Sequence, residues 1–220
     1  MRIILWFMVI SFGLTVGLNF FPRLDIGISN IFFLAPTQFI LTDHPGAEVF
    51  RTLMSVIIWG LGIGLAIILV LNITKGRRFL GLDKRQIIFI YLCFLIGPGL
   101  VVNLMLKEHW GRARPSHIVE LGGNKTFSPV FTPSVACTTN CSFASGEAAL
   151  GFGFVSFGLL RPKPYKRAIF LGLGMGILIS LIRLMAGGHF LSDISFSAGI
   201  TLFFMMILYS LLIARRPSLT

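Results

Sequence analysis

Three short polar segments interrupt a largely apolar sequence and hold its most reactive side chains. They are KEHWGRARP at 107–115, SFASGE at 142–147 and RLMAGGHFLSD at 183–193. Lys107 and Arg114 are seven residues apart, which places both on one face if the segment is helical, and Arg183 can point the same way from a neighbouring span. Three cations, with the backbone N–H groups of a helix starting at Ser145 and Gly146, predict a site for a multiply charged oxyanion such as phosphate.

His189 and Asp193 add the pattern of an oriented nucleophile. They are four residues apart, so on a helix the carboxylate can accept the proton of one ring nitrogen while the other nitrogen faces the anion. A neutral imidazole beside a bound phosphate is a nucleophile.

Taken singly, Lys107 and Arg112 could instead extend to lipid headgroups, and Arg183 could pair with Asp193. The occurrence of all these groups at one membrane depth favours a functional site.

The elements that must position these segments follow from the composition. Of 220 residues, 55% are hydrophobic and 12% are charged, and the mean hydropathy is +0.87. One soluble core cannot bury so much apolar surface, so we predict an all-α polytopic membrane protein with six transmembrane helices in one bundle. The predicted spans are 3–21, 53–73, 87–106, 148–160, 168–186 and 191–214, within a single membrane-embedded domain over residues 1–220. The fourth span has only about 13 residues, where roughly 17 to 25 are needed to cross a bilayer.

The distribution of cations predicts the orientation. Twelve of the nineteen Lys and Arg residues are Arg2 or lie in the segments KGRRFLGLDKR at 75–85, RPKPYKR at 161–167 and ARRPSLT at 214–220. Six spans would place all of these on one side, which the positive-inside rule makes cytoplasmic, with both termini there. The net charge of +11 then reflects the orientation of the chain in the membrane, and we expect no nucleic-acid partner.

Two of the three cysteines lie close together. Cys137 and Cys141 have three residues between them in the loop on the side opposite the basic segments, whereas Cys93 lies inside the third predicted span. On an oxidising side of the membrane the pair could close a small loop through a disulfide, and free thiols are the alternative. We expect no metal site, because no second ligand pair lies nearby at metal-binding spacing.

The spacing of the reactive residues matches a known pattern. Lys107, six residues, Arg114-Pro115, then Ser145-Gly146, then Arg183, five residues, His189, three residues and Asp193 resembles the three-part signature of the type 2 phosphatidic acid phosphatase superfamily. Within it, the segments at 21–26, 97–103, 107–115, 140–148 and 187–193 are similar to bacterial lipid A 4′-phosphatases. The resemblance implies a multi-pass enzyme of the bacterial inner membrane, with its site facing the periplasm and with no metal or other cofactor.

The resemblance also implies the role of each residue. His189 would attack phosphorus and form a phosphohistidine, and Asp193 would orient its ring. The groups expected to hold the phosphate oxygens are Lys107, Arg114, Ser145, the Gly146 amide and Arg183. His109 and Arg112 are further candidates for the site.

Three positions depart from the superfamily pattern. Ala144 replaces the usual proline, Ile182 replaces the usual serine and Glu147 replaces the usual histidine. An acid at position 147 is also typical of the lipid A 4′-phosphatase group. We expect Glu147 to be the general acid for the leaving oxygen, with His109 and His117 as rivals.

The predicted activity is removal of a phosphate monoester from lipid A, at its 4′ position, on the periplasmic face. Lipid A 1-phosphate, undecaprenyl pyrophosphate and phosphatidylglycerol phosphate are alternative substrates, because each presents phosphate at the same membrane depth. An anion transporter is the alternative from another class, although transport needs no oriented nucleophile. The expected partners are the lipid substrate and membrane lipids, and the sequence does not fix the oligomeric state.

Overall fold

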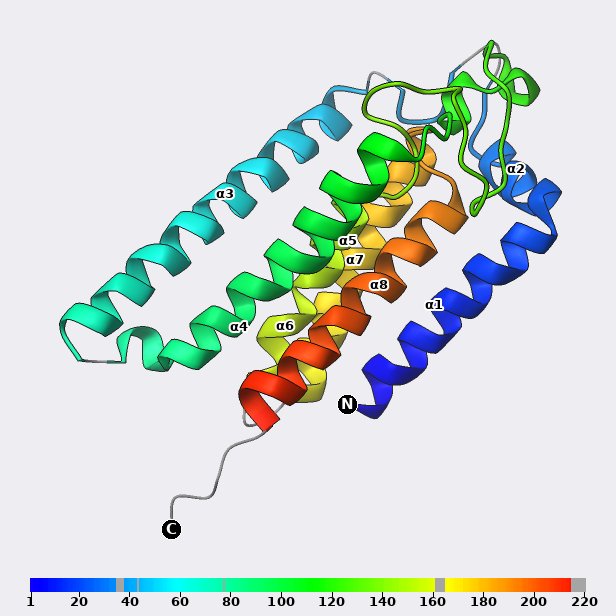
Figure 1. Cartoon of the computed structure of the whole chain (residues 1–220). Coiled ribbons are helices and arrows are strands. Elements are labelled where there is room, and N and C mark those ends of the chain that lie inside the picture. Colours follow the sequence, from blue (N-terminus) through cyan, green and yellow to red (C-terminus); the bar gives the residue numbers. More distant parts are fainter. Residues whose placement is uncertain (35–37, 43, 77, 161–164, 215–220) are drawn as a thin grey trace.

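The regular secondary structure of the described residues is helical, as predicted, apart from two isolated β-bridges. The computed structural model describes residues 1–34, 38–42, 44–76, 78–160 and 165–214 (Figure 1). Its α-helices are α1 (Arg2–Phe20), α2 (Pro22–Asn30), α3 (Pro45–Thr74), α4 (Lys84–Phe94), α5 (Gly146–Gly153), α6 (Val155–Leu159), α7 (Tyr165–Met185) and α8 (Leu191–Tyr209). Two π-helical segments, Leu95–Lys107 and Ser210–Ala214, continue α4 and α8, and three 3-10 turns lie at Phe79–Gly81, Pro115–His117 and Val119–Leu121.

Five helices in the described part of the chain are long and apolar enough to cross a membrane. They are Arg2–Phe20, Pro45–Thr74, Lys84–Lys107, Lys166–Met185 and Leu191–Ala214. The remaining predicted span corresponds to the shorter apolar helix Gly146–Leu159, which consists of α5 and α6. Its roughly 14 residues reach about 21 Å, whereas the hydrocarbon layer is about 30 Å thick. Five of the six predicted spans are therefore supported, and the fourth stays a prediction.

The short helices α5 and α6 lie inside the bundle. Both pack against α7, and α5 also contacts α8 and the π-helical segment. Glycines allow this close approach, since a Cβ atom on Gly172 would lie 2.7 Å from the Cα of Val155. In Figure 1, α5 and α6 lead from the end that carries the long loop, residues 108–145, to the opposite end, where the N-terminus and the connection from α3 to α4 lie.

The helix that begins at Lys84 changes its winding midway. Pro98 has no N–H and its ring crowds the preceding turn, so an α-helix is disfavoured there. From Leu95 the backbone is π-helical instead, and the side-chain amide of Asn103 donates to the Pro98 carbonyl at 2.8 Å. Lys107 is the last residue of this wider helix, which therefore sets where that lysine enters the site.

The segments before α3 and after the π-helix form a cap over one end of the bundle. A buried apolar cluster joins them and contains Phe39, Ala113, Ile118, Leu121 and Phe190. Backbone hydrogen bonds tie the cap to the α7–α8 connection, from Leu41 to the Met185 carbonyl at 3.0 Å and from Ser116 to the Gly187 carbonyl at 3.1 Å. Residues of the three polar segments found in the sequence interact with one another at this end of the bundle.

Candidate active site

Three cations from three different elements surround the site. Lys107 ends the π-helical segment, Arg114 lies in the following loop and Arg183 lies in the last turn of α7. The segment between Lys107 and Arg114 is not a continuous helix, because the chain turns at Gly111, so the two residues do not share one helix face. This glycine has a φ of +70°, and a Cβ atom there would lie 1.7 Å from the Ser134 carbonyl oxygen. The turn still leaves Lys107 in electrostatic contact with Arg114 and Arg183.

His189 is buried, with 1% of its surface exposed, and it precedes α8 instead of lying on it. Its Nδ1 lies 2.7 Å from the backbone carbonyl oxygen of Ser142. The predicted pairing of this ring nitrogen with Asp193 is therefore wrong. Because a carbonyl oxygen can only accept, Nδ1 carries the proton and Nε2 keeps its lone pair.

The surroundings of His189 favour the neutral ring. Burial lowers the pKa of His189 well below its ordinary value of 6.5, and the charges of Arg183, Arg114 and Lys107 lower it further. The hydrogen bond to Ser142 opposes these effects only in part. The imidazole is therefore neutral at pH 7 and lies within electrostatic range of all three cations.

Asp193 acts on the histidine through an intermediate residue. The Ser142 hydroxyl donates to Asp193 Oδ2 at 2.5 Å, and the Ser142 amide donates to the Arg112 carbonyl at 2.9 Å. Asp193 Oδ2 also accepts the Phe190 amide at 2.9 Å and so caps the start of α8. These contacts fix the Ser142 carbonyl that orients His189. The sequence placed Ser142 in the right segment without indicating this role.

Arg112 was a further candidate for phosphate binding, and the structure corrects this. Its side chain is fully buried and lies 2.5 Å from Asp193 Oδ1 and 3.0 Å from Asp25 Oδ2. It also donates to the Ser192 hydroxyl at 2.7 Å and to the Ser128 carbonyl at 2.9 Å. Because its N–H groups are engaged in these contacts, Arg112 holds other residues of the site in place and does not bind phosphate.

Asp25, on α2, is a site-supporting residue that the sequence reasoning missed. It binds Arg112 and accepts from both the amide and the hydroxyl of Ser192, the amide at 3.1 Å. Burial raises the pKa of Asp25, the charge of Arg112 opposes this rise and the charge of Asp193 adds to it. The available signal was that Asp25, one of only eight acidic residues, lies in the segment FPRLDI directly after the first predicted span.

The start of α5 holds three of the predicted residues. The Ser145 hydroxyl accepts the Ala148 amide at 3.4 Å and caps the helix. Gly146 is the first helical residue, and a Cβ atom there would lie 2.1 Å from Asn103 Oδ1. Glu147 is 36% exposed and lies 3.3 Å from Arg183 Nε. Glu147 thus lies beside one of the three cations, and phosphate binding by Ser145 and Gly146 stays a prediction.

The rival acids lie on the exposed surface. His109 is exposed, and its Nδ1 contacts the Met105 carbonyl at 3.0 Å. His117 is also exposed, and its pKa is lowered by partial burial and by the charges of Arg114 and Lys125. Neither contact directs these rings towards His189.

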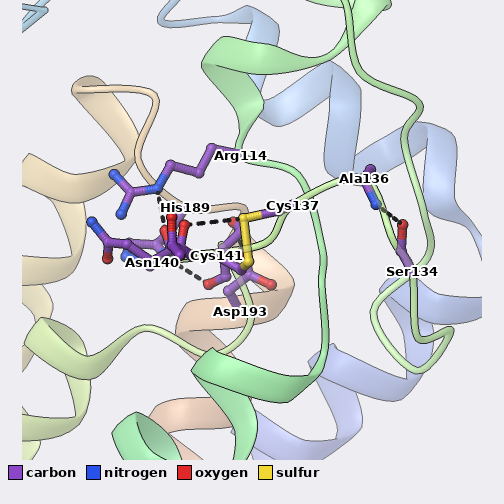
Figure 2. Close-up of a disulfide and its surroundings, with 10 residues drawn as sticks. Arg114, Ser134, Ala136, Cys137, Asn140, Cys141, His189 and Asp193 are labelled. Carbon is purple, nitrogen blue, oxygen red and sulfur yellow. Dashed lines mark hydrogen bonds between the residues drawn. A yellow bond between two sulfur atoms is a disulfide. The ribbon is translucent and has the colours of Figure 1, made fainter.

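Cys137 and Cys141 are joined by a disulfide next to the site, with their Cα atoms 5.6 Å apart. The Nε of Arg114 donates to the carbonyl of Asn140, inside the disulfide-closed loop, at 3.1 Å. Figure 2 shows Arg114, His189 and Asp193 gathered around this disulfide.

A neutral, oriented histidine among three cations, at one end of a membrane helix bundle, defines a membrane-embedded phosphatase. The family model described as "PAP2 superfamily" matches residues 88–217. The chain belongs to this superfamily, and it is a phosphoric monoester hydrolase.

Known relatives agree with this assignment. The chain is 31% identical over 223 residues to the lipid A 4′-phosphatase of Francisella tularensis subsp. novicida, which covers 95% of both chains. It is 33% identical to the lipid A 4′-phosphatase of Rhizobium leguminosarum, over 79% of this chain and 81% of the relative. It is 37% identical over 106 residues to the lipid A 1-phosphatase of Rhizobium johnstonii, over 47% of this chain and 39% of the relative. No solved structure matches the chain.

We predict that Arg112→Met destabilises the protein by about 3–5 kcal/mol, because it leaves two buried carboxylates without their cation. Unfolding in detergent measures this difference. Arg114→Met, the same substitution two residues away on a partly exposed side chain, is the control and should change stability little. Equal destabilisation by both variants would contradict a special role for Arg112.

We predict that His189 stays neutral at about pH 6, where an ordinary histidine is mostly protonated, because burial and the three cations lower its pKa. Nitrogen NMR of protein with labelled histidine measures both the charge and the tautomer, and His189→Gln identifies the signal. In the denaturant-unfolded chain the same residue should titrate near pH 6.5. Detection of an imidazolium at pH 6.5 or above in the folded protein would refute the prediction.

Proposed function

We propose that the protein removes the 4′-phosphate of lipid A at the periplasmic face of a bacterial inner membrane. The observation that carries this proposal is the neutral His189, whose Nδ1 donates to Ser142 while its Nε2 is left to attack a phosphate held by Lys107, Arg114 and Arg183. The relatives named lipid A 4′-phosphatases support the substrate, because one of them aligns over 95% of the chain.

In the first step Nε2 of His189 attacks phosphorus and the bond from phosphorus to the sugar oxygen breaks. The Nδ1–H bond to Ser142 then stabilises the charge that appears on the ring. Lys107, Arg114 and Arg183 hold the non-bridging oxygens as charge spreads onto them, together with Ser145 and the Gly146 amide. The product of this step is a phosphohistidine.

Glu147 is the proposed proton donor. It lies at the exposed side of the site next to Arg183, where it can reach the leaving oxygen of a lipid entering from the membrane surface. After donating its proton, the carboxylate takes one from water, which attacks phosphorus and breaks the bond to Nε2. Inorganic phosphate leaves and His189 returns to its starting form.

The proposed orientation uses the charge distribution and the fold together. The N-terminus and the basic connection between α3 and α4 lie at the end opposite the site (Figure 1). The positive-inside rule makes that end cytoplasmic, together with the N-terminus. Residues 161–164 and 215–220, which hold other basic residues used for the predicted orientation, lie outside the described residues. We also propose that α5 and α6 together form the fourth of six membrane crossings, since the chain runs along them between the two ends of the bundle. Their polar start is sheltered by the cap instead of facing lipid.

Other lipid phosphates remain alternatives for the same chemistry. The partial match to a lipid A 1-phosphatase makes the 1-phosphate the nearest of these, and undecaprenyl pyrophosphate and phosphatidylglycerol phosphate present similar groups. An anion transporter has no need for the ordered path from Asp193 through Ser142 to His189.

We predict that purified protein releases phosphate from lipid A and that His189→Ala lowers the rate by about a thousandfold or more, because the attacking nitrogen is lost. Mass spectrometry of the product should show loss of one phosphate from the 4′ position. His44→Asn, at the exposed N-cap of α3, is the matched control and should retain activity. Equal release by wild type and His189→Ala would reject the mechanism, and loss of the 1-phosphate would reject the position.

We predict that Glu147→Gln lowers hydrolysis of the lipid by about 10²–10⁴-fold, because the sugar oxygen leaves without a proton. In the first turnover the same variant should release p-nitrophenol from p-nitrophenyl phosphate nearly normally, because that leaving group needs no proton. First-turnover rates on the two substrates therefore separate acid catalysis from the contact with Arg183. An equal loss of the first-turnover rate on both substrates would show that Glu147 only positions Arg183.

A further inference from the structure

The disulfide between Cys137 and Cys141 closes a short loop, and a backbone hydrogen bond holds the chain at each end of it. The Cys137 amide donates to the Gly111 carbonyl at 3.0 Å, and the Ser142 amide donates to the Arg112 carbonyl at 2.9 Å. Between these bonds the chain runs out through three exposed residues and returns at the buried Cys141. The disulfide closes the base of this loop (Figure 2).

This loop contacts Arg114, one of the cations proposed to bind phosphate. Asn140 has a φ of 52°, a conformation that asparagine tolerates better than most residues, and its carbonyl accepts the Nε of Arg114 at 3.1 Å. A guanidinium held through Nε can still present its two terminal nitrogens to a phosphate as a fork. The Asn140 carbonyl is therefore placed to aim Arg114.

We propose that Cys137 and Cys141 are positioning residues for Arg114. Their disulfide fixes the Asn140 carbonyl, and this carbonyl directs the guanidinium towards the substrate phosphate. Without the covalent closure, the exposed tip gains conformational freedom and holds Arg114 less well. The inference rests on the proposed function, in which Arg114 binds phosphate, and it means that full activity requires a compartment where disulfides form.

The effect should be specific to phosphate binding. Ser142, which orients His189, lies next to Cys141, but it is held separately by the Arg112 carbonyl and by Asp193. Opening the disulfide should therefore loosen Arg114 and leave the imidazole in place. A loss of general structure would affect both.

The test compares wild type with the Cys137→Ser/Cys141→Ser double variant, each also in an Arg114→Lys background. Arg114→Lys keeps the charge but removes the guanidinium Nε that donates to Asn140. In the wild-type background the double variant should raise the KM and the Kd for inorganic phosphate about tenfold, because a displaced group loses much of its effect. In the Arg114→Lys background the change should be less than about twofold, since the interaction is already absent.

Two further measurements complete the design. Reduction of the folded wild-type protein should reproduce the tenfold change without relying on the folding of the double variant, and reductant should leave the double variant unaffected. The tautomer of His189 measured by NMR should be unchanged by either treatment, because the Ser142 carbonyl still holds its Nδ1–H.

The outcomes separate the two hypotheses. Unchanged phosphate binding after reduction, or an equal loss in both backgrounds, would overturn the positioning role. Failure of the proposed function would appear differently, as a wild-type protein that binds phosphate but releases none from lipid.

Discussion

The buried guanidinium of Arg112 is the interaction on which the site depends. Moving a charge out of water is costly, and it is tolerated only where counter-charges and hydrogen bonds replace the lost hydration. Here Asp25 and Asp193 supply the charges, and the rings of Phe127 and Phe190 lie 5.4 Å and 4.4 Å from the guanidinium carbon. Because these partners come from α2, the long loop and the start of α8, one side chain sets the relative position of all three.

The consequences extend outward from this network to the substrate. Asp193 and the Arg112 backbone hold Ser142, and Ser142 orients His189. Asp25 and Asp193 are engaged in that network, so they do not neutralise the outer cluster of Lys107, Arg114 and Arg183. That division of charge suits a site that must keep its histidine neutral and still attract an anion.

The N-terminal helices take part in this arrangement although the family model begins at residue 88. Asp25 on α2 reaches Arg112 in the matched region, and α1 packs along α8. The buried Thr15 on α1 contacts Ser195 at 2.9 Å, which adds a polar link inside the bundle. The first two helices therefore help to support the site, and α1 is also long and apolar enough to cross a membrane.

The helical membrane class, five of the spans and the polar segments of the site can be predicted from the amino-acid sequence alone. They follow from hydropathy runs and residue types, which are local properties of the chain. The pairing of side chains depends instead on how the helices pack: Ser142 and not Asp193 orients His189, 47 residues away, and Arg112 pairs with Asp25, 87 residues away, instead of binding substrate. A buried cation takes the carboxylates that packing brings to it, and spacing along the chain does not reveal which those are.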